Sequence, residues 1–166
     1  MLVFENKFLR VVDAIYGNIV KIGSNLQSTF LLYMRLMWGH KLFLHGIQKI
    51  THKETVIQFF GTLDLTYPVA TTYIVSFFEV ACGLLFVFGF MSRLAALPVM
   101  IIMISALSLA HSDAFIEWRF LFEPMRLVQQ APYPFLVTAF LIFIFGPGRV
   151  SIDAWFKRWS QKQPKF

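Results

Sequence analysis

Apolar residues along this chain gather into four blocks that are separated by more polar stretches. The blocks cover residues 29–50, 68–90, 93–111 and 132–145. Helices of about 17–25 mainly apolar residues are long enough to cross a bilayer. The pattern therefore predicts an all-α fold, with a transmembrane four-helix bundle in residues 28–150. The first block is the least apolar, so it needs neighbouring helices to cover its polar groups.

The two ends of the chain show a different pattern, in which apolar side chains recur every three or four residues. The apolar positions near the N-terminus are Phe4, Phe8, Val11, Ile15, Ile19 and Ile22. In the tail, Ser151 is a predicted helix cap, and Trp155 and Trp159 lie on the apolar side. Such faces are typical of helices that lie in the membrane surface. We expect an interfacial amphipathic segment at 1–27 and a basic amphipathic tail at 151–166, with docking on a partner protein as the alternative.

Composition narrows the class of protein. Hydrophobic residues make up 57% of the chain and charged residues 14%, whereas a typical soluble domain has about a quarter charged residues. Cys82 is the single cysteine, which excludes an intrachain disulfide or dithiol reaction. A redox role would therefore need a bound cofactor such as a quinone, or a partner protein. The net charge of +6 resides in the termini and short loops, so we expect no nucleic-acid partner.

The distribution of Lys and Arg predicts the orientation in the membrane. Nine of them would share the face of the two termini: Lys7, Arg10, Lys21, Arg93, Arg149, Lys157, Arg158, Lys162 and Lys165. Four would lie on the opposite face: Lys49, Lys53, Arg119 and Arg126. Cytoplasmic loops carry an excess of Lys and Arg, so we expect both termini in the cytoplasm.

The first block carries ionisable residues at bilayer depth, where each costs roughly 2.5–3.5 kcal/mol on insertion scales. At about 100° per residue, several of its polar and aromatic residues share one inward face. These residues are Arg35, Trp38, His45 and Lys49. Gly39 and Gly46 would let a neighbouring helix come close to this face. Lys41 points away from it, which makes Lys41 a poorer candidate for a site.

The second block adds Glu79 near its middle, within reach of Arg35 or His45 on an antiparallel neighbour. Ser108 and His111 of the third block would face the same space. We therefore expect a polar pocket that opens on the non-cytoplasmic side. Its predicted floor is Arg35 and Glu79, and its predicted mouth is His45, Lys49 and His111.

Two interpretations of these groups remain open. An Arg35–Glu79 pair could simply fix the register of the bundle, or it could belong to a binding site. His45 and Lys49 favour a binding site, because a structural ion pair needs no further basic groups beside it. The spacing of His45, Glu79 and His111 gives no specific support for a metal site.

The same positions carry a pattern that resembles the DoxX family of small integral membrane proteins. It comprises Arg35-Leu36, Gly39, Phe43-Leu44-His45-Gly46 and Lys49, then Glu79, Gly83-Leu84-Leu85, Gly89-Phe90 and Arg93, and finally Gly146-Pro147-Gly148-Arg149 and Ser151-Ile152-Asp153. The resemblance covers roughly residues 32–153. It implies a four-helix protein of the bacterial cytoplasmic membrane. Members are usually subunits or accessory proteins of redox systems, including thiosulfate:quinone oxidoreductase.

We therefore expect a redox-associated membrane subunit whose pocket binds a quinone or a small anion. His45 and Glu79 would exchange protons, and the substrate-binding candidates are Arg35, Trp38, Lys49, Ser108 and His111. The competing hypothesis is a non-enzymatic scaffold that docks through the aromatic outer loop at 112–131. A small transporter is a third possibility, although four helices without a repeat do not favour it. A protein partner or a homo-oligomer is expected in addition to the lipid bilayer.

Overall fold

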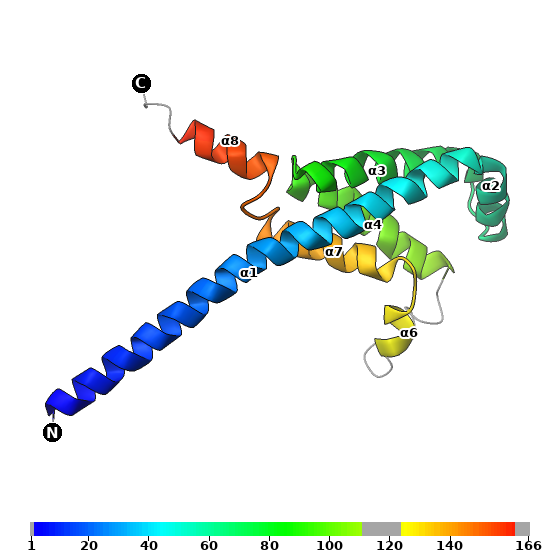
Figure 1. Ribbon diagram of the computed structural model, residues 1–166. Coiled ribbons are helices and arrows are strands. Elements are labelled where there is room, and N and C mark those ends of the chain that lie inside the picture. Colours follow the sequence, from blue (N-terminus) through cyan, green and yellow to red (C-terminus); the bar gives the residue numbers. More distant parts are fainter. Residues whose placement is uncertain (1, 111–123, 162–166) are drawn as a thin grey trace.

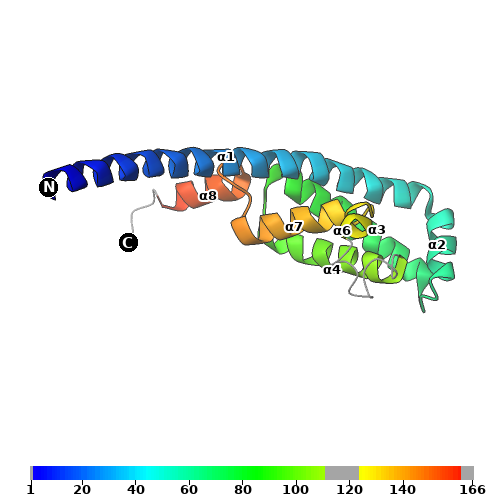
Figure 2. The same ribbon diagram turned by 90° about the horizontal axis from the view of Figure 1, so that it is seen from below.

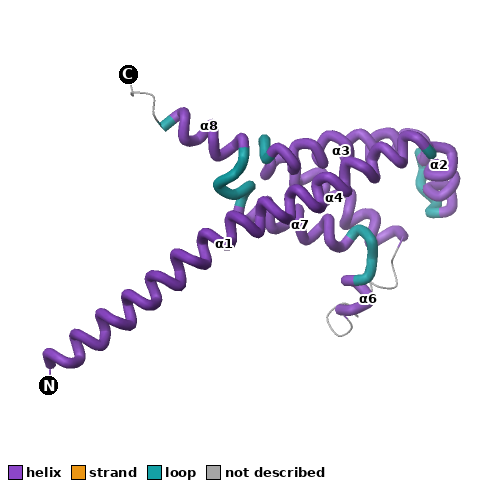
Figure 3. The backbone as a smooth tube through the Cα atoms, viewed as in Figure 1, coloured by secondary structure: helices purple, strands orange, loops and turns teal. Residues whose placement is uncertain are grey.

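Helices account for the regular structure in the part of the chain that the computed structural model describes, residues 2–110 and 124–161, and no strand occurs there (Figures 1 and 3). The helices are α1 (Leu2–Thr51), α2 (Lys53–Thr62), α3 (Pro68–Phe88), α4 (Ser92–Ala110), α6 (Pro124–Val128), α7 (Tyr133–Phe145) and α8 (Ile152–Ser160). The predicted all-α class is confirmed.

The first helix, α1, joins two segments that the sequence pattern presents as separate helices. No proline stands between residues 2 and 51, and neither Gly17 nor Gly23 ends the helix. Its 50 residues extend over about 75 Å at 1.5 Å per residue, more than twice the roughly 30 Å of a bilayer core. Figures 1 and 2 show its N-terminal half extending beyond the other helices. No helix end therefore occurs at the expected boundary near residue 27.

The C-terminal half of α1 packs along α3 and α7, while α4 contacts both α3 and α7. The contact between α1 and α3 is very close. A Cβ atom added at Gly46 would lie 2.8 Å from the Val80 nitrogen, and one at Gly83 would lie 2.6 Å from the Phe43 nitrogen. Small residues at membrane helix contacts allow such approaches. The predicted close approach at the glycines of α1 is confirmed.

Those glycines also fix the register of the two antiparallel helices. Gly46 lies against Val80, and Gly39 lies against Phe86. Each step toward the N-terminus of α1 thus corresponds to a step toward the C-terminus of α3. Arg35, one turn before Gly39, is therefore level with the end of α3. Glu79 is level with the part of α1 between His45 and Lys49.

The outer faces of α3 and α4 are apolar. Both helices are long and apolar enough to cross a membrane, and only 33% and 28% of their most apolar windows are buried within the protein. Phe77 on α3 is 65% exposed and Ile101 on α4 is 66% exposed. The core helix of a soluble protein would bury most of this surface. The apolar helix α7 has 13 residues, which is short for a membrane span.

The last helix, α8, is tied to the connection between α3 and α4. Ser151 caps α8 by accepting a hydrogen bond from the Ala154 nitrogen at 3.1 Å, as the sequence predicts. The Asp153 carboxylate accepts hydrogen bonds from the backbone nitrogens of Met91 (2.8 Å) and Ser92 (3.1 Å). These contacts hold the start of α8 beside the start of α4.

Candidate functional site

A cavity of about 730 Å³ lies at the end of the molecule that carries α2. We call it the apolar cavity. It is enclosed by α1, α2, α3 and α4 and by the start of α7. Its apolar walls include Leu42, Val56, Phe59, Phe60, Leu63, Leu65, Val75, Ile101, Ile102, Met103, Leu109 and Phe135. Its volume falls within the range of about 300–1,000 Å³ that is usual for small-molecule sites.

An ion pair stands on the wall of the apolar cavity. The Lys49 Nζ atom donates to the Glu79 Oε1 atom at 2.6 Å. The Glu79 side chain is only 4% exposed, and that of Lys49 is 27% exposed. The second carboxylate oxygen of Glu79, Oε2, is buried and has no hydrogen-bond partner within the described residues. Buried polar atoms usually have a partner, so this oxygen is a buried acceptor without its usual donor, on a residue that lines the cavity.

His45 lies one turn before Lys49 on α1 and also lines the apolar cavity. Its ring is exposed and packs edge-on against Phe135, with 5.5 Å between the ring centroids. An imidazole can donate or accept a proton near neutral pH. The cavity thus combines one proton-exchanging ring with a paired cation and a free carboxylate oxygen. The predicted convergence of His45, Lys49 and Glu79 is observed.

The expected contact between Glu79 and Arg35 is wrong. Arg35 is 1% exposed and lies away from the apolar cavity. Its guanidinium donates to the carbonyls of Phe86 (2.9 Å), Val87 (3.3 Å), Val150 (3.1 Å) and Pro147. The register of α1 and α3 explains this difference, because Arg35 is level with the last turn of α3. The last carbonyls of a helix lack donors within it, and here the Phe86 carbonyl accepts from Arg35 as well as from the Gly89 nitrogen (3.2 Å).

Two further predicted site residues, Trp38 and Ser108, do not line the apolar cavity. Trp38 packs edge-on against Phe135 at 5.3 Å between centroids and lies beside the buried core. The Ser108 hydroxyl donates to the Ile104 carbonyl at 2.8 Å, within its own helix. Ser105 contributes the serine that does line the cavity. His111 and residues 112–123 of the aromatic outer loop lie outside the described residues.

Within the described residues, no three His, Cys, Asp or Glu side chains are grouped closely enough to hold a metal ion. The cation of Lys41 lies 4.8 Å from the centre of the Trp38 ring, on an exposed side of α1. Lys41 is not among the residues of the cavity, as its position on the helix predicts.

The helix α2 was missed by the sequence-based prediction, which assigned no helix to the stretch between the blocks at 29–50 and 68–90. This short helix supplies Val56, Phe59 and Phe60 to the cavity wall, and the residue that caps it, Leu63, follows on the same side. Their spacing of three and four residues is the signal of an amphipathic helix, and it could have revealed α2. Because α2 contributes apolar side chains, the pocket that was predicted to be polar is a mostly apolar cavity.

Comparison with protein families matches residues 30–112, half of the 166-residue chain, to the family described as DoxX. Over 76 residues the chain is 32% identical to the Bacillus subtilis (strain 168) protein named "Putative oxidoreductase CatD". That match covers 46% of this chain and 55% of the relative, so the chain spans about half of the relative's length. A comparison with solved structures gives no match.

Proposed function

Because this chain belongs to the DoxX family, we propose that it is a membrane subunit associated with a redox system and that its apolar cavity binds a quinone. The similarity to the protein named "Putative oxidoreductase CatD" supports the redox association. The proposed ligand class comes from the cavity itself, which offers apolar walls for a ring and an isoprenoid chain. A few polar groups stand at one place on its wall.

The observation that carries the proposal is the free oxygen of the buried Glu79 carboxylate. A quinol hydroxyl can donate a hydrogen bond to Oε2, which has no partner in the described structure. The cation of Lys49 and the ring of His45 can each donate to a quinone carbonyl. The donors suit the carbonyls of the oxidised quinone, and the acceptor suits a hydroxyl of the reduced quinol. A purely apolar ligand would leave Oε2 without a donor, which is unfavourable.

A small anion fits this arrangement less well. The charge of Lys49 is already neutralised by Glu79 at 2.6 Å. A second anion would stand beside the carboxylate, where like charges repel. Thiosulfate therefore serves as the competing ligand in the binding experiment.

Four membrane crossings complete the proposal. The span proposed for α1 is residues 29–50, and α7 is extended by the residues at its ends. The N-terminal half of α1 and the aromatic face of α8 would then lie at the cytoplasmic surface of a bacterial inner membrane. The gathering of Arg93, Arg149 and Lys157 at the end that carries α8 supports this orientation.

In a redox system the bound quinone would take up two electrons and two protons to become a quinol. The redox partner would supply the electrons, because the lone Cys82 offers no dithiol. His45 would pass protons to the ligand, and Glu79 would bind and release a proton at Oε2. Both groups line the same cavity.

Binding of decylubiquinone and of menadione to the purified full chain in nanodiscs tests the proposal. Loss of a charge-assisted hydrogen bond costs about 1.5–3 kcal/mol, so Glu79→Gln should weaken binding roughly 10–100-fold. Glu54→Gln is the matched control, because Glu54 is exposed on α2 and does not line the cavity. His45→Ala is compared with His40→Ala in the same way.

Equal binding by Glu79→Gln and Glu54→Gln would contradict the proposed role of Glu79. Displacement of the quinone by thiosulfate at similar concentrations would favour an anion site instead. Failure of every quinone to bind, together with a stoichiometric protein partner in pull-downs, would favour the scaffold hypothesis. Unfolding midpoints measured on the same samples separate lost binding from lost structure.

A further inference from the structure

A second cavity of about 730 Å³ lies at the opposite end of the molecule, beside α8. We call it the basic cavity. It is bordered by α1, the start of α4, the loop at 146–151 and the start of α8. Of the described residues, three with cationic side chains line it, namely Arg93, Arg149 and Lys157, and one with a carboxylate, Asp153. The two cavities have no lining residue in common in the part of the chain that the structure describes.

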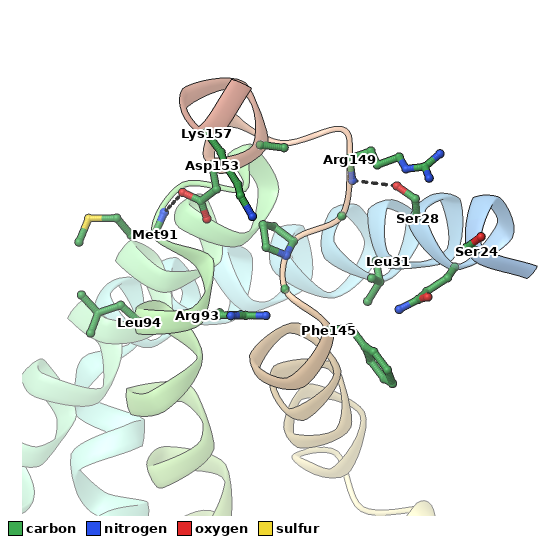
Figure 4. Close-up of a pocket in the computed structure, with 15 residues that line it drawn as sticks. Ser24, Ser28, Leu31, Met91, Arg93, Leu94, Phe145, Arg149, Asp153 and Lys157 are labelled. Atoms are coloured by element: carbon green, nitrogen blue, oxygen red, sulfur yellow. Dashed lines mark hydrogen bonds between the residues drawn. The ribbon is translucent and has the colours of Figure 1, made fainter. Parts of the chain in front are cut away.

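The positive charge of the basic cavity is not neutralised within the described residues, where none of the three cations forms an ion pair. The Asp153 carboxylate accepts instead from the backbone nitrogens of Met91 and Ser92. Figure 4 shows Arg93 and Lys157 extending from α4 and α8 toward the same central space. Arg149 extends along α1, where its guanidinium donates to the Asn25 Oδ1 atom at 2.6 Å. The cavity therefore has a net positive charge and an inward-facing pair of cations.

The backbone around these cations is held in place before any ligand arrives. The buried Arg35 guanidinium binds the carbonyls of Pro147 and Val150, which fixes both ends of the loop that carries Arg149. The Arg149 nitrogen also donates to the Ser28 hydroxyl at 2.8 Å. One wall of the cavity is thus ordered in advance, and an ordered wall lowers the entropy cost of binding.

The surroundings of the basic cavity suit the surface of a membrane. The most exposed aromatic residues of α8 are Trp155 (60%) and Trp159 (55%), and tryptophan is enriched where bilayer meets water. The cavity also lies where α3 has ended and α4 begins. Leu94 (58% exposed) and Phe145 (52% exposed) line it and continue along the apolar faces of α4 and α7. A ligand here would meet cations at one end and apolar helix surface at the other.

We propose that the basic cavity binds an anionic phospholipid of the phosphatidylglycerol class. Its phosphate would lie between Arg93 and Lys157, and its acyl chains would follow Leu94 and Phe145 along the bundle. Basic pockets between membrane helices on the cytoplasmic side are suited to acidic head groups. The proposal depends on the membrane topology given above but not on quinone binding.

Native mass spectrometry of the full chain, released from detergent with dioleoyl phosphatidylglycerol or dioleoyl phosphatidylcholine, tests the proposal. The wild type should retain the phosphatidylglycerol preferentially. A basic residue near the surface contributes about 1 kcal/mol to such binding, so the double variant Arg93→Gln/Lys157→Gln should lose roughly 10–30-fold in apparent affinity. Lys157→Gln alone, on the exposed α8, should give a partial loss and does not disturb the Arg93 contact with the Ile144 carbonyl.

Lys41→Gln/Lys53→Gln is the matched control, because it removes the same charge from exposed positions outside the basic cavity. It should retain the wild-type preference. Equal retention by the control and by the Arg93→Gln/Lys157→Gln variant would overturn the proposal. Displacement of the lipid by an equal concentration of inorganic phosphate would also overturn it, because the site would then be one for free phosphate. Quinone binding should be unchanged in the variants, so failure here is distinguishable from failure of the proposed function.

Discussion

Replacement of Arg35 by methionine tests how the buried guanidinium contributes to the fold. Arg35 is 1% exposed and donates to four backbone carbonyls, two at the end of α3 and two in the loop before α8. A hydrogen bond to a charged group contributes about 1.5–3 kcal/mol. The four bonds share one side chain, so their contributions do not add independently. We expect Arg35→Met to lower the free energy of unfolding by about 3–5 kcal/mol.

Unfolding in SDS of the purified chain, followed by tryptophan fluorescence and far-ultraviolet circular dichroism, gives the measurement. Arg10→Met is the matched control on the same helix, at an exposed position, and should change stability by less than about 0.5 kcal/mol. Arg35→Lys adds a second comparison. Lysine keeps the charge but cannot reach carbonyls on two sides as a guanidinium does, so it should recover little of the stability.

Two results would refute this reasoning. If Arg35→Met unfolded at the same SDS concentration as Arg10→Met, the four carbonyl contacts would contribute nothing. If Arg35→Lys were as stable as the wild type, Arg35 would act through its charge alone.

Further predictions concern the contact between α1 and α3. Lys49→Met should lower the free energy of unfolding by about 3–5 kcal/mol, because it leaves the Glu79 charge unpaired. Adding Glu79→Gln to the same chain should recover much of that loss. If SDS unfolding showed the double variant to be as unstable as Lys49→Met, the ion pair would be contradicted. Gly83→Ala should cost about 1–3 kcal/mol because its new methyl group would lie 2.6 Å from the Phe43 nitrogen. Gly17→Ala, with no atom within 4 Å, should be neutral or stabilising, and equal midpoints for the two glycine variants would exclude the close contact.

The sequence predicts best those features that depend on one helix alone, such as its length, its cap and the face on which a residue lies. The apolar length of α3 and α4 and the Ser151 cap follow from local patterns, and the structure has each of them. The angular position of residues around α1 also follows from 3.6 residues per turn. A helical projection based on this period correctly places His45 and Lys49 on one face and Lys41 on another.

The partners of the charged residues could not be predicted in the same way. A helical projection gives the direction of a side chain but not its level along a neighbouring helix. Placing Glu79 opposite Lys49 instead of Arg35 requires the register that Gly39 and Gly46 set against α3. Charge complementarity alone allows either pairing. The positions of the charged residues in the sequence do not predict that Arg35 donates to backbone carbonyls.

The pattern of polar and apolar residues also could not predict that α1 is one continuous helix. The composition changes near residue 27, but a helix ends only where its backbone hydrogen bonds end. Gly17 and Gly23 lower helix propensity by roughly 1 kcal/mol each, which is too little to break a long helix. The change of composition therefore could not show that the backbone of α1 continues as one helix through residue 27.

Photolabelling with an azido-quinone in nanodiscs, followed by peptide mass spectrometry, tests the central claim most directly. The account predicts labelling on the wall of the apolar cavity, at residues 55–65 of α2 and its following turn and at Phe135 of α7. Glu79→Gln should diminish this labelling, and Glu54→Gln should not. Labelling spread evenly over the lipid-facing residues of α3 and α4, and equal in both variants, would show that the cavity is not a quinone site.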